Sequence, residues 1–378
     1  MTAPLTAACL EKPVEPRVWL LQSDRAGDNN QVLALGELLG LPAARKRVIY
    51  RSPVLLPKIV AARSSNLLVA GVDRRRSTPL APPWPDLVIS AGREMEPVAR
   101  WIRRQAGGRT RLVHMGRPWA PLEAFDLVIS TPQYALPERD NVLVISLPLH
   151  RVTRERLAAE AAAWAPRFRR LPGPRTAVLL GGNSGSFVFN PRKGTELGRL
   201  VNDRAQTEGG SLLVTDSART APETFEAFAA ELTVPNYVYR WQEGAVANPY
   251  FAFLGVADRL VTTGESVSML AEASVTGKPL YIYDLDEPLP AGATAPQRLR
   301  AALRYHALRD RLAHLFGPAY MQRDIGVIQR QLVAGGRAAW LNRDGAPARE
   351  AAPRPPAAAD DLRALWRIRD LLGQALPC

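Results

Sequence analysis

Short apolar runs alternate with longer segments of helical spacing through the first half of the chain. Apolar residues recur at helical spacing over 28–39 and 94–105. Strands that alternate with helices in this way predict a parallel sheet covered by helices. The expected strands are Val18 to Gln22, Arg47 to Tyr50, Leu67 to Gly71, Asp86 to Ser90, Arg111 to His114, Asp126 to Ser130 and Asn141 to Ile145.

The same alternation resumes after a Leu-Pro-Gly-Pro break at 171–174, which follows a helix expected over 153–169. Further strands are expected near Ala177, Ser211, Tyr237, Arg259 and Leu280. Beyond Pro290 the spacing is helical at 296–315, 324–333 and 359–373, with a flexible Ala-, Pro- and Arg-rich linker at 345–356. We therefore predict an α/β protein with domains at 1–170 and 171–345, followed by a linker and terminal helix at 346–378.

The segment from Ala257 to Asp284 contains a strand, a tight turn, a helix and a second strand. The helix is expected over 265–276, and Gly277 ends it. Such a turn points free N–H groups and the positive end of a helix at an anion above the sheet. A carboxylate about two turns into the helix can accept hydrogen bonds from a ribose. The predicted nucleotide-binding residues here are Gly264, Glu265, Ser266, Ser268 and Glu272, and the alternative is an ordinary βαβ unit with a solvated glutamate.

A second glycine-bearing loop, GGNSGS at 181–186, lies between an apolar strand and a helix expected over 195–206. Its glycines let the backbone approach a ligand closely, and its Asn and Ser residues offer donors. Phosphate is the expected guest, although the loop is neither a Walker loop nor a dinucleotide fingerprint. The predicted phosphate-binding residues are Gly181, Gly182, Asn183 and Ser184, with Lys193 or an arginine assisting.

A third loop, SDRAGDNNQ at 23–31, opens the first helix. Glycine-bearing turns in both halves predict two Rossmann-like domains that face one another across a cleft. Asp24 and Asp28 are candidate general bases, as is His114, which follows an apolar strand at its carboxyl end. The alternatives are structural. Asp28 or Asn29 can cap the helix, and His114 can be a hydrogen-bonded histidine at the end of a strand. The remaining acceptor-side residues of the loop are Arg25, Gly27, Asn30 and Gln31.

These motifs resemble the glycosyltransferase B fold and, more narrowly, the mitochondrial-fission (elongated-mitochondria) family, whose bacterial members are labelled nucleoside-diphosphate-sugar epimerases. The resemblance covers roughly residues 17–345 and rests on QSDRAGDNNQ, LLGGNSGSFVFN and TTGESVSMLAEASVTGKP. It implies a nucleotide-sugar bound by the second domain, terminal helices that cross back to the first, and Trp241 against the nucleobase, with core packing as the alternative. The family usually has Asp in place of Glu265 and His in place of Asp28, so this chain lacks that histidine.

Arginine supplies nearly all of the positive charge behind the net charge of +13. Because the sequence shows no basic surface interspersed with aromatic residues, we expect no nucleic-acid partner. The positive field favours anionic ligands and can hold the protein weakly at an anionic membrane face. The apolar runs are too short to span a bilayer and no secretory signal is evident, so we expect a cytoplasmic protein, peripheral to the inner membrane at most. The Cys and His spacings predict no metal site.

Three function classes follow. The first is an inverting, metal-independent glycosyltransferase that uses a nucleoside-diphosphate sugar as donor substrate, needs no cofactor, and acts on an unknown acceptor, lipid-linked or glycan. The second is a nucleoside-diphosphate-sugar epimerase or hydrolase on the same scaffold. The third is a non-catalytic interaction protein of the mitochondrial-fission type. The fold alone does not choose among them.

Overall fold

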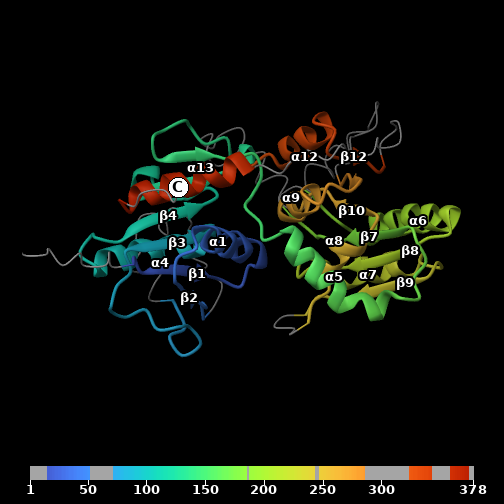
Figure 1. The fold of residues 1–378 in the computed structure, drawn as a ribbon, viewed down its shortest axis with the longest axis horizontal. Coiled ribbons are helices and arrows are strands. Elements are labelled where there is room, and N and C mark those ends of the chain that lie inside the picture. The colour runs from blue at the N-terminus through green and yellow to red at the C-terminus, as the bar shows by residue number, and fades with distance from the viewer. Residues whose placement is uncertain are drawn as a thin grey trace, which may run out of the picture. The chain divides into compact units, whose positions relative to one another are not determined.

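The computed structural model describes residues 15–51, 71–184, 187–242, 247–285, 323–342 and 358–373. The chain forms two compact units, Met1–Val128 with Arg363–Cys378, and Ile129–Leu362. The described residues form two six-stranded sheets with the orders β2-β1-β3-β4-β5-β6 and β12-β11-β10-β7-β8-β9 (Figure 1). This architecture confirms the predicted α/β class with two Rossmann-like sheets. The predicted functional boundaries at 170 and 345 stay a prediction.

The first sheet is built from parallel strands whose central members are buried. In β3 all residues are buried, as expected of a parallel strand with both faces covered. Its strands are β1 (Val18–Gln22), β2 (Ala43–Arg47), β3 (Leu87–Ala91), β4 (Arg111–Met115), β5 (Leu127–Ser130) and β6 (Val142–Val144). Its helices and 3-10 turns are α1 (Ala26–Leu39), α4 (Gly92–Gln105), η1 (Leu122–Ala124) and η2 (Pro132–Tyr134).

The C-terminal helix α13 (Ala358–Leu371) returns to the first unit, because its residues from Arg363 onward belong to that unit. The Arg369 guanidinium donates to the carbonyl of Leu39 at the end of α1 at 3.4 Å. The expected return of the terminal helix is therefore confirmed.

The second sheet is covered by helices on both faces. One apolar cluster joins it to α5, α8, α9 and α12, and another joins it to α6 and α7. Its strands are β7 (Arg175–Leu179), β8 (Ser211–Thr215), β9 (Asn236–Tyr239), β10 (Arg259–Thr263), β11 (Leu280–Tyr283) and β12 (Ala339–Trp340). Its helices are α5 (Arg154–Phe168), α6 (Pro191–Glu208), α7 (Pro222–Ala229), α8 (Tyr250–Val256), α9 (Val267–Ser274) and α12 (Ile325–Ala334).

Strand order reverses once in each sheet, and the reversal positions the loops of interest. In the second sheet β7 pairs with β8 on one side and with β10 on the other. In the first sheet β1 pairs in the same way with β2 and β3. Open parallel sheets bind ligands at such switch points, outside the carboxyl ends of the strands. The loops after β7 and β10, and those after β1 and β3, lie at these positions.

Several predicted elements differ from the structure. The strand expected over 47–50 lies earlier, at β2, because pairing with β1 places the polar segment Ala43–Arg47 at the sheet edge. Helix α9 begins at Val267 rather than at Glu265. The pattern missed α7, α8 and β12. The strand expected over 67–71 lies mostly outside the described residues, as do the whole of the helix over 296–315 and the linker over 345–356.

Candidate functional site

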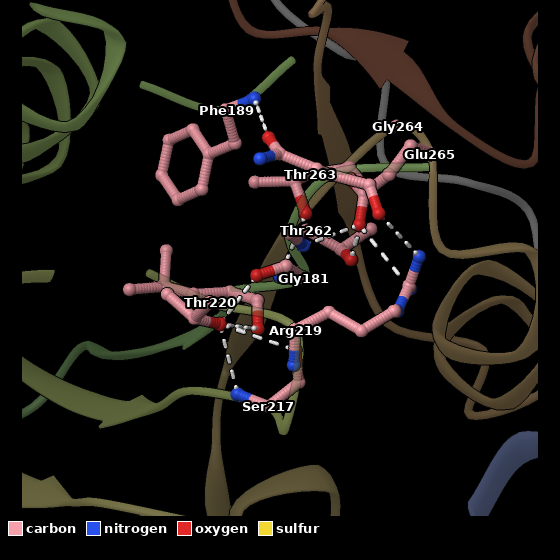
Figure 2. A network of polar contacts seen from close by, with 12 residues as sticks. Gly181, Phe189, Ser217, Arg219, Thr220, Thr262, Thr263, Gly264 and Glu265 are labelled. Carbon is pink, nitrogen blue, oxygen red and sulfur yellow. Dashed lines mark hydrogen bonds and ion pairs between the residues drawn. The ribbon is translucent and has the colours of Figure 1, made fainter. Parts of the chain in front are cut away.

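The loops after β7 and β10 are joined by hydrogen bonds at the switch point of the second sheet (Figure 2). The N–H of Gly181 donates to Thr263 Oγ1 at 2.8 Å. The N–H of Gly182 donates to Glu265 Oε1 at 2.7 Å. Two amides predicted to face a phosphate therefore donate to side chains of the protein itself.

Both positions require glycine because the neighbouring atoms fill the space of a side chain. A Cβ on Gly181 would lie 2.8 Å from Glu265 Cδ and from Thr263 Oγ1, and closer still to Glu265 Oε1. A Cβ on Gly182 would overlap the backbone carbonyl of Arg219. The loop is thus built around the Glu265 carboxylate on one side and the loop after β8 on the other.

The loop after β8 completes this cluster. Arg219 Nη2 lies 3.4 Å from Glu265 Oε1, and Arg219 Nη1 donates to the carbonyl of Asn183 at 3.4 Å. The Thr220 hydroxyl donates to the carbonyl of Gly181. Three loops from neighbouring strands β8, β7 and β10 therefore meet at one edge of the sheet, with one cation and one carboxylate between them.

Glu265 is fully enclosed in this cluster. The residue is 1% exposed, whereas the Arg219 side chain is 43% exposed. Within the described part of the chain, Glu265 Oε2 has no hydrogen-bond partner. Most buried polar atoms in proteins have a hydrogen-bond partner, so this carboxylate oxygen is unusual.

Asn183 and Ser184 hold the shape of the glycine loop. Asn183 Oδ1 accepts from the N–H of Phe189 at 2.8 Å. The backbone of Ser184 exchanges two hydrogen bonds with that of Phe187, each of 3.0 Å. Lys193, expected to assist with phosphate, is buried and donates to the carbonyls of Val188 and Leu285 at 3.0 and 2.6 Å. This lysine therefore ties the loop to the end of β11.

Glu272 lies within α9 and is only 3% exposed. Its Oε2 accepts a hydrogen bond of 2.5 Å from the Tyr250 hydroxyl. Burial raises the pKa of Glu272 to about 7, although this bond and the positive charge of Arg151 act in the opposite direction. Glu265 precedes α9, so unlike Glu272 it lies outside the helix, which was expected to begin at residue 265.

The remaining predicted nucleotide-binding residues lie around the same edge. Ser266 is buried at the start of α9, whose first turn has no side-chain cap, and Ser268 is partly buried in that turn. Gly264 donates to the carbonyl of Tyr283 at 2.9 Å. Trp241 is partly buried, and its backbone N–H donates to Asp216 Oδ1. The other carboxylate oxygen of Asp216, Oδ2, accepts from Arg240 Nε.

In the first unit, the predicted loop lies at the switch point between β1 and β3. Asp24 is exposed and lies 3.5 Å from Arg47 Nη2, and Arg25 Nη2 lies 3.5 Å from Glu94 Oε1. Asp28 lies in the first turn of α1, and its Cγ would be 3.1 Å from a Cβ on Gly92, at the start of α4. The carboxylate therefore lies against the N-terminus of the helix that follows β3.

The first helix begins at Ala26 with Arg25 as its N-cap, so the expected caps Asp28 and Asn29 lie inside it. Asn29 instead joins the two ends of the loop, accepting from the N–H of Ser23 and donating to its carbonyl. Gly27, Asn30 and Gln31 also lie within this helix. The Gln31 amide lies 3.5 Å from the carbonyl of Gly27.

His114 lies inside β4 and has no exposed surface. Its Nδ1 lies 2.9 Å from the Ser90 hydroxyl on the neighbouring strand, and its ring lies against Phe125. Burial lowers the pKa of His114 to about 3, which keeps the imidazole neutral near pH 7. Among the described residues Nε2 has no partner.

Among the described residues, no group of three or more His, Cys, Asp and Glu side chains could hold a metal ion. None of the helices in that part of the chain is long and apolar enough to cross a bilayer.

Sequence comparison decides the family. The sequence profile of the family described as "Mitochondrial fission ELM1" matches residues 26–318. The chain belongs to this mitochondrial fission ELM1 family. The resemblance drawn from the three motifs is therefore confirmed, and two of those motifs form the cluster around Glu265 in this family member.

Two relatives illustrate the breadth of the family. The Arabidopsis thaliana mitochondrial fission protein ELM1 is 31% identical over 228 residues, a match that covers 53% of this chain and 52% of the plant protein. This chain thus spans about half of the length of that relative. An uncharacterized protein of Rickettsia prowazekii is 23% identical over 306 residues, which cover 70% of this chain and 82% of the relative.

Solved structures of similar shape are distant in sequence. A Neisseria meningitidis UDP-GlcNAc 2-epimerase bound to UDP-GlcNAc is 11% identical, with a TM-score of 0.44 over 84% of this chain and 98% of its own. A Staphylococcus aureus MnaA–UDP complex is 10% identical, with a TM-score of 0.49 over 95% and 98%. A Rickettsia africae glycosyltransferase is 10% identical, with a TM-score of 0.43 over 96% and 100%. Likenesses this distant say nothing about the ligand of this family member.

The sequence did not predict the side chains that contact the glycine loop and the two glutamates. Thr263, Arg219 and Tyr250 each contact a predicted residue from another loop or helix. Thr263 stands beside the predicted turn at 264, and its hydroxyl at the carboxyl end of a strand was the available signal. Arg219 and Tyr250 carry no local motif that marks them.

Proposed function

We propose that the second unit binds a nucleoside-diphosphate sugar at the switch point between β7 and β10, and that the protein is a glycosyltransferase. The observation that carries this proposal is the convergence of three strand-end loops on a buried carboxylate and a partly exposed arginine at that position. Ligands of open α/β sheets bind at such an edge. Family membership is consistent with a site built from two of the shared motifs.

The available donors fit a diphosphate. Arg219 supplies a cation with exposed surface, and the first turn of α9 supplies N–H groups that no side chain caps. Guanidinium groups and helix N-termini are standard phosphate partners in proteins. Because these groups can stabilise the departing diphosphate, we propose a transfer that needs no metal.

Glu272 is proposed to accept the ribose hydroxyls. It lies within the helix whose start would face the phosphate, and its carboxylate already accepts a hydroxyl group, that of Tyr250. A strongly raised pKa in a buried carboxyl at such a position is common at functional sites. The acceptor is proposed to bind the loop of the first unit, where Asp24 or Asp28 would take its proton.

The second candidate function is binding of the nucleotide without catalytic turnover. The observation that favours it is that Gly181 and Gly182 donate to Thr263 and Glu265 rather than into open space. A hydrolase would also release nucleotide, but without transfer of the sugar, whereas an epimerase would invert a sugar stereocentre with no net release of nucleotide.

One panel tests these alternatives. The protein is incubated with UDP-, GDP-, ADP- and CMP-sugars, and the thermal midpoint, the released nucleotide and the configuration of the sugar are measured. Ligand at about a hundred times its dissociation constant should stabilise the fold by about 2.7 kcal/mol. Release together with sugar transfer supports the transferase, and release without an acceptor supports the hydrolase. A changed sugar configuration supports the epimerase, and a thermal shift alone supports binding without turnover. No shift with any nucleotide at millimolar concentration contradicts the proposal.

A further inference from the structure

The Gly182 amide and the Arg219 guanidinium together form an anion receptor that the protein itself occupies. The Gly182 N–H lies 2.7 Å from Glu265 Oε1. Arg219 Nη2 lies 3.4 Å from the same oxygen (Figure 2). A backbone N–H and a guanidinium that meet at one acceptor oxygen are a donor set suited to phosphate. In this structure a carboxylate takes that place.

The carboxylate lies where a ligand could be accommodated. Gly181 has no side chain at the position that Glu265 Oε1 and Cδ fill, so the space is defined by backbone on one side. If Glu265 moved away, the same backbone would face an empty pocket lined by the Gly182 N–H. A glycine at this point permits either anion to approach the backbone closely.

The carboxylate is also held incompletely. Its Oε2 has no partner among the described residues, although an ionised carboxylate can accept about four hydrogen bonds. A buried oxygen that lacks a donor raises the free energy of the occupied state, because it has lost its water. Moving Glu265 toward solvent restores that hydration. Arg219 is partly exposed, so its side chain can follow either anion.

We propose that Glu265 is an internal competitor of the ligand phosphate: nucleotide binding displaces its carboxylate from the Gly182 N–H and from Arg219. The inference rests on the proposed nucleotide site and adds how the ligand gains access to it. Nucleotide affinity then depends on how much more strongly the ligand phosphate than the Glu265 carboxylate binds the Gly182 N–H and Arg219. In the alternative, the Glu265 carboxylate stays in place when nucleotide binds and holds the loop in its binding conformation. A neutral substitution at 265 would then weaken nucleotide binding rather than strengthen it.

The test compares Glu265→Gln with the wild type by calorimetric titration with UDP, GDP, ADP and CDP, and with inorganic diphosphate. Glutamine keeps an oxygen for the Gly182 N–H but removes the competing charge, so affinity should rise about five-fold or more. Glu226→Gln, an exposed carboxylate on α7, makes the same change of net charge away from the site and should bind like the wild type. Arg219→Gln should weaken binding in both the wild type and the Glu265→Gln background.

Glu265→Asp provides a second variant if the glutamine variant does not fold. Aspartate keeps the charge but is one methylene shorter, so its carboxylate should lose the hydrogen bond to the Gly182 N–H. The Glu265→Asp variant should therefore also bind nucleotide more tightly than the wild type. Binding by the wild type with equal or weaker binding by the position-265 variants overturns displacement and leaves the proposed function standing. Absence of binding by every variant overturns the proposed function and this inference with it.

Discussion

Gly181→Ala should destabilise the second unit because the new methyl group would collide with the Glu265 side chain. A Cβ there would lie 2.8 Å from Glu265 Cδ and from Thr263 Oγ1, and would overlap Oε1. Forced overlap in a packed site typically costs about 1–3 kcal/mol. For a unit of this size, each kcal/mol lowers the thermal midpoint by roughly 2–4 °C. The cost of Gly181→Ala is measured by thermal unfolding of the full chain.

A double-mutant cycle attributes this cost to the carboxylate. In a Glu265→Ala background most of the overlap is absent, so Gly181→Ala should cost less there by about 1 kcal/mol or more. Gly198→Ala is the control, since its Cβ would meet the carbonyl oxygen of Phe228 at 2.6 Å and the Glu231 side chain rather than Glu265. Its cost should be the same in both backgrounds. Equal cost of Gly181→Ala with and without Glu265 would refute the placement of the carboxylate against the glycine loop.

Three further outcomes are expected. Because the pKa of Glu272 is raised to about 7, the folded protein keeps the Glu272 carboxyl protonated at pH values where the unfolded chain has lost that proton. The free energy of unfolding should therefore fall as pH rises from about 4.5 to about 7. Glu272→Gln should remove this fall, which thermal unfolding at a series of pH values would measure. Lys193→Met should lower the midpoint by several degrees while leaving nucleotide affinity within about two-fold, because the ammonium group binds carbonyls. Asp24→Asn or Asp28→Asn should reduce sugar transfer about 10²–10⁴-fold without changing nucleotide affinity; unchanged turnover in both would remove this loop from the mechanism.

The buried strands were predictable because parallel strands covered on both faces are almost continuously apolar. The expected bounds of β1 match the structure, and those of β3 and β4 differ by a residue at most at each end. The edge strand β2 was misplaced because Val48 and Ile49 are apolar, whereas the paired segment Ala43–Arg47 is mostly polar. Its position depends on hydrogen bonds to β1 rather than on its own pattern.

The site was predictable as a set of loops but not as a set of contacts. Gly182 and Glu265 are separated by 83 residues, and their hydrogen bond depends on β10 pairing with β7. No local pattern specifies that pairing. The same holds for Arg219, which reaches Glu265 only because β8 lies on the other side of β7. A glycine-rich loop predicts that something approaches the backbone closely, and here that partner is the protein's own carboxylate.

Hydrogen exchange measured by mass spectrometry on the full chain, with and without saturating nucleoside diphosphate, tests the central claim most directly. The claim is that the ligand binds at the switch point between β7 and β10. The account predicts slower exchange in peptides that contain 180–184 and 264–270, with unchanged exchange in α7. Protection confined to the first unit, or absent from both loops while nucleotide is bound, would contradict it.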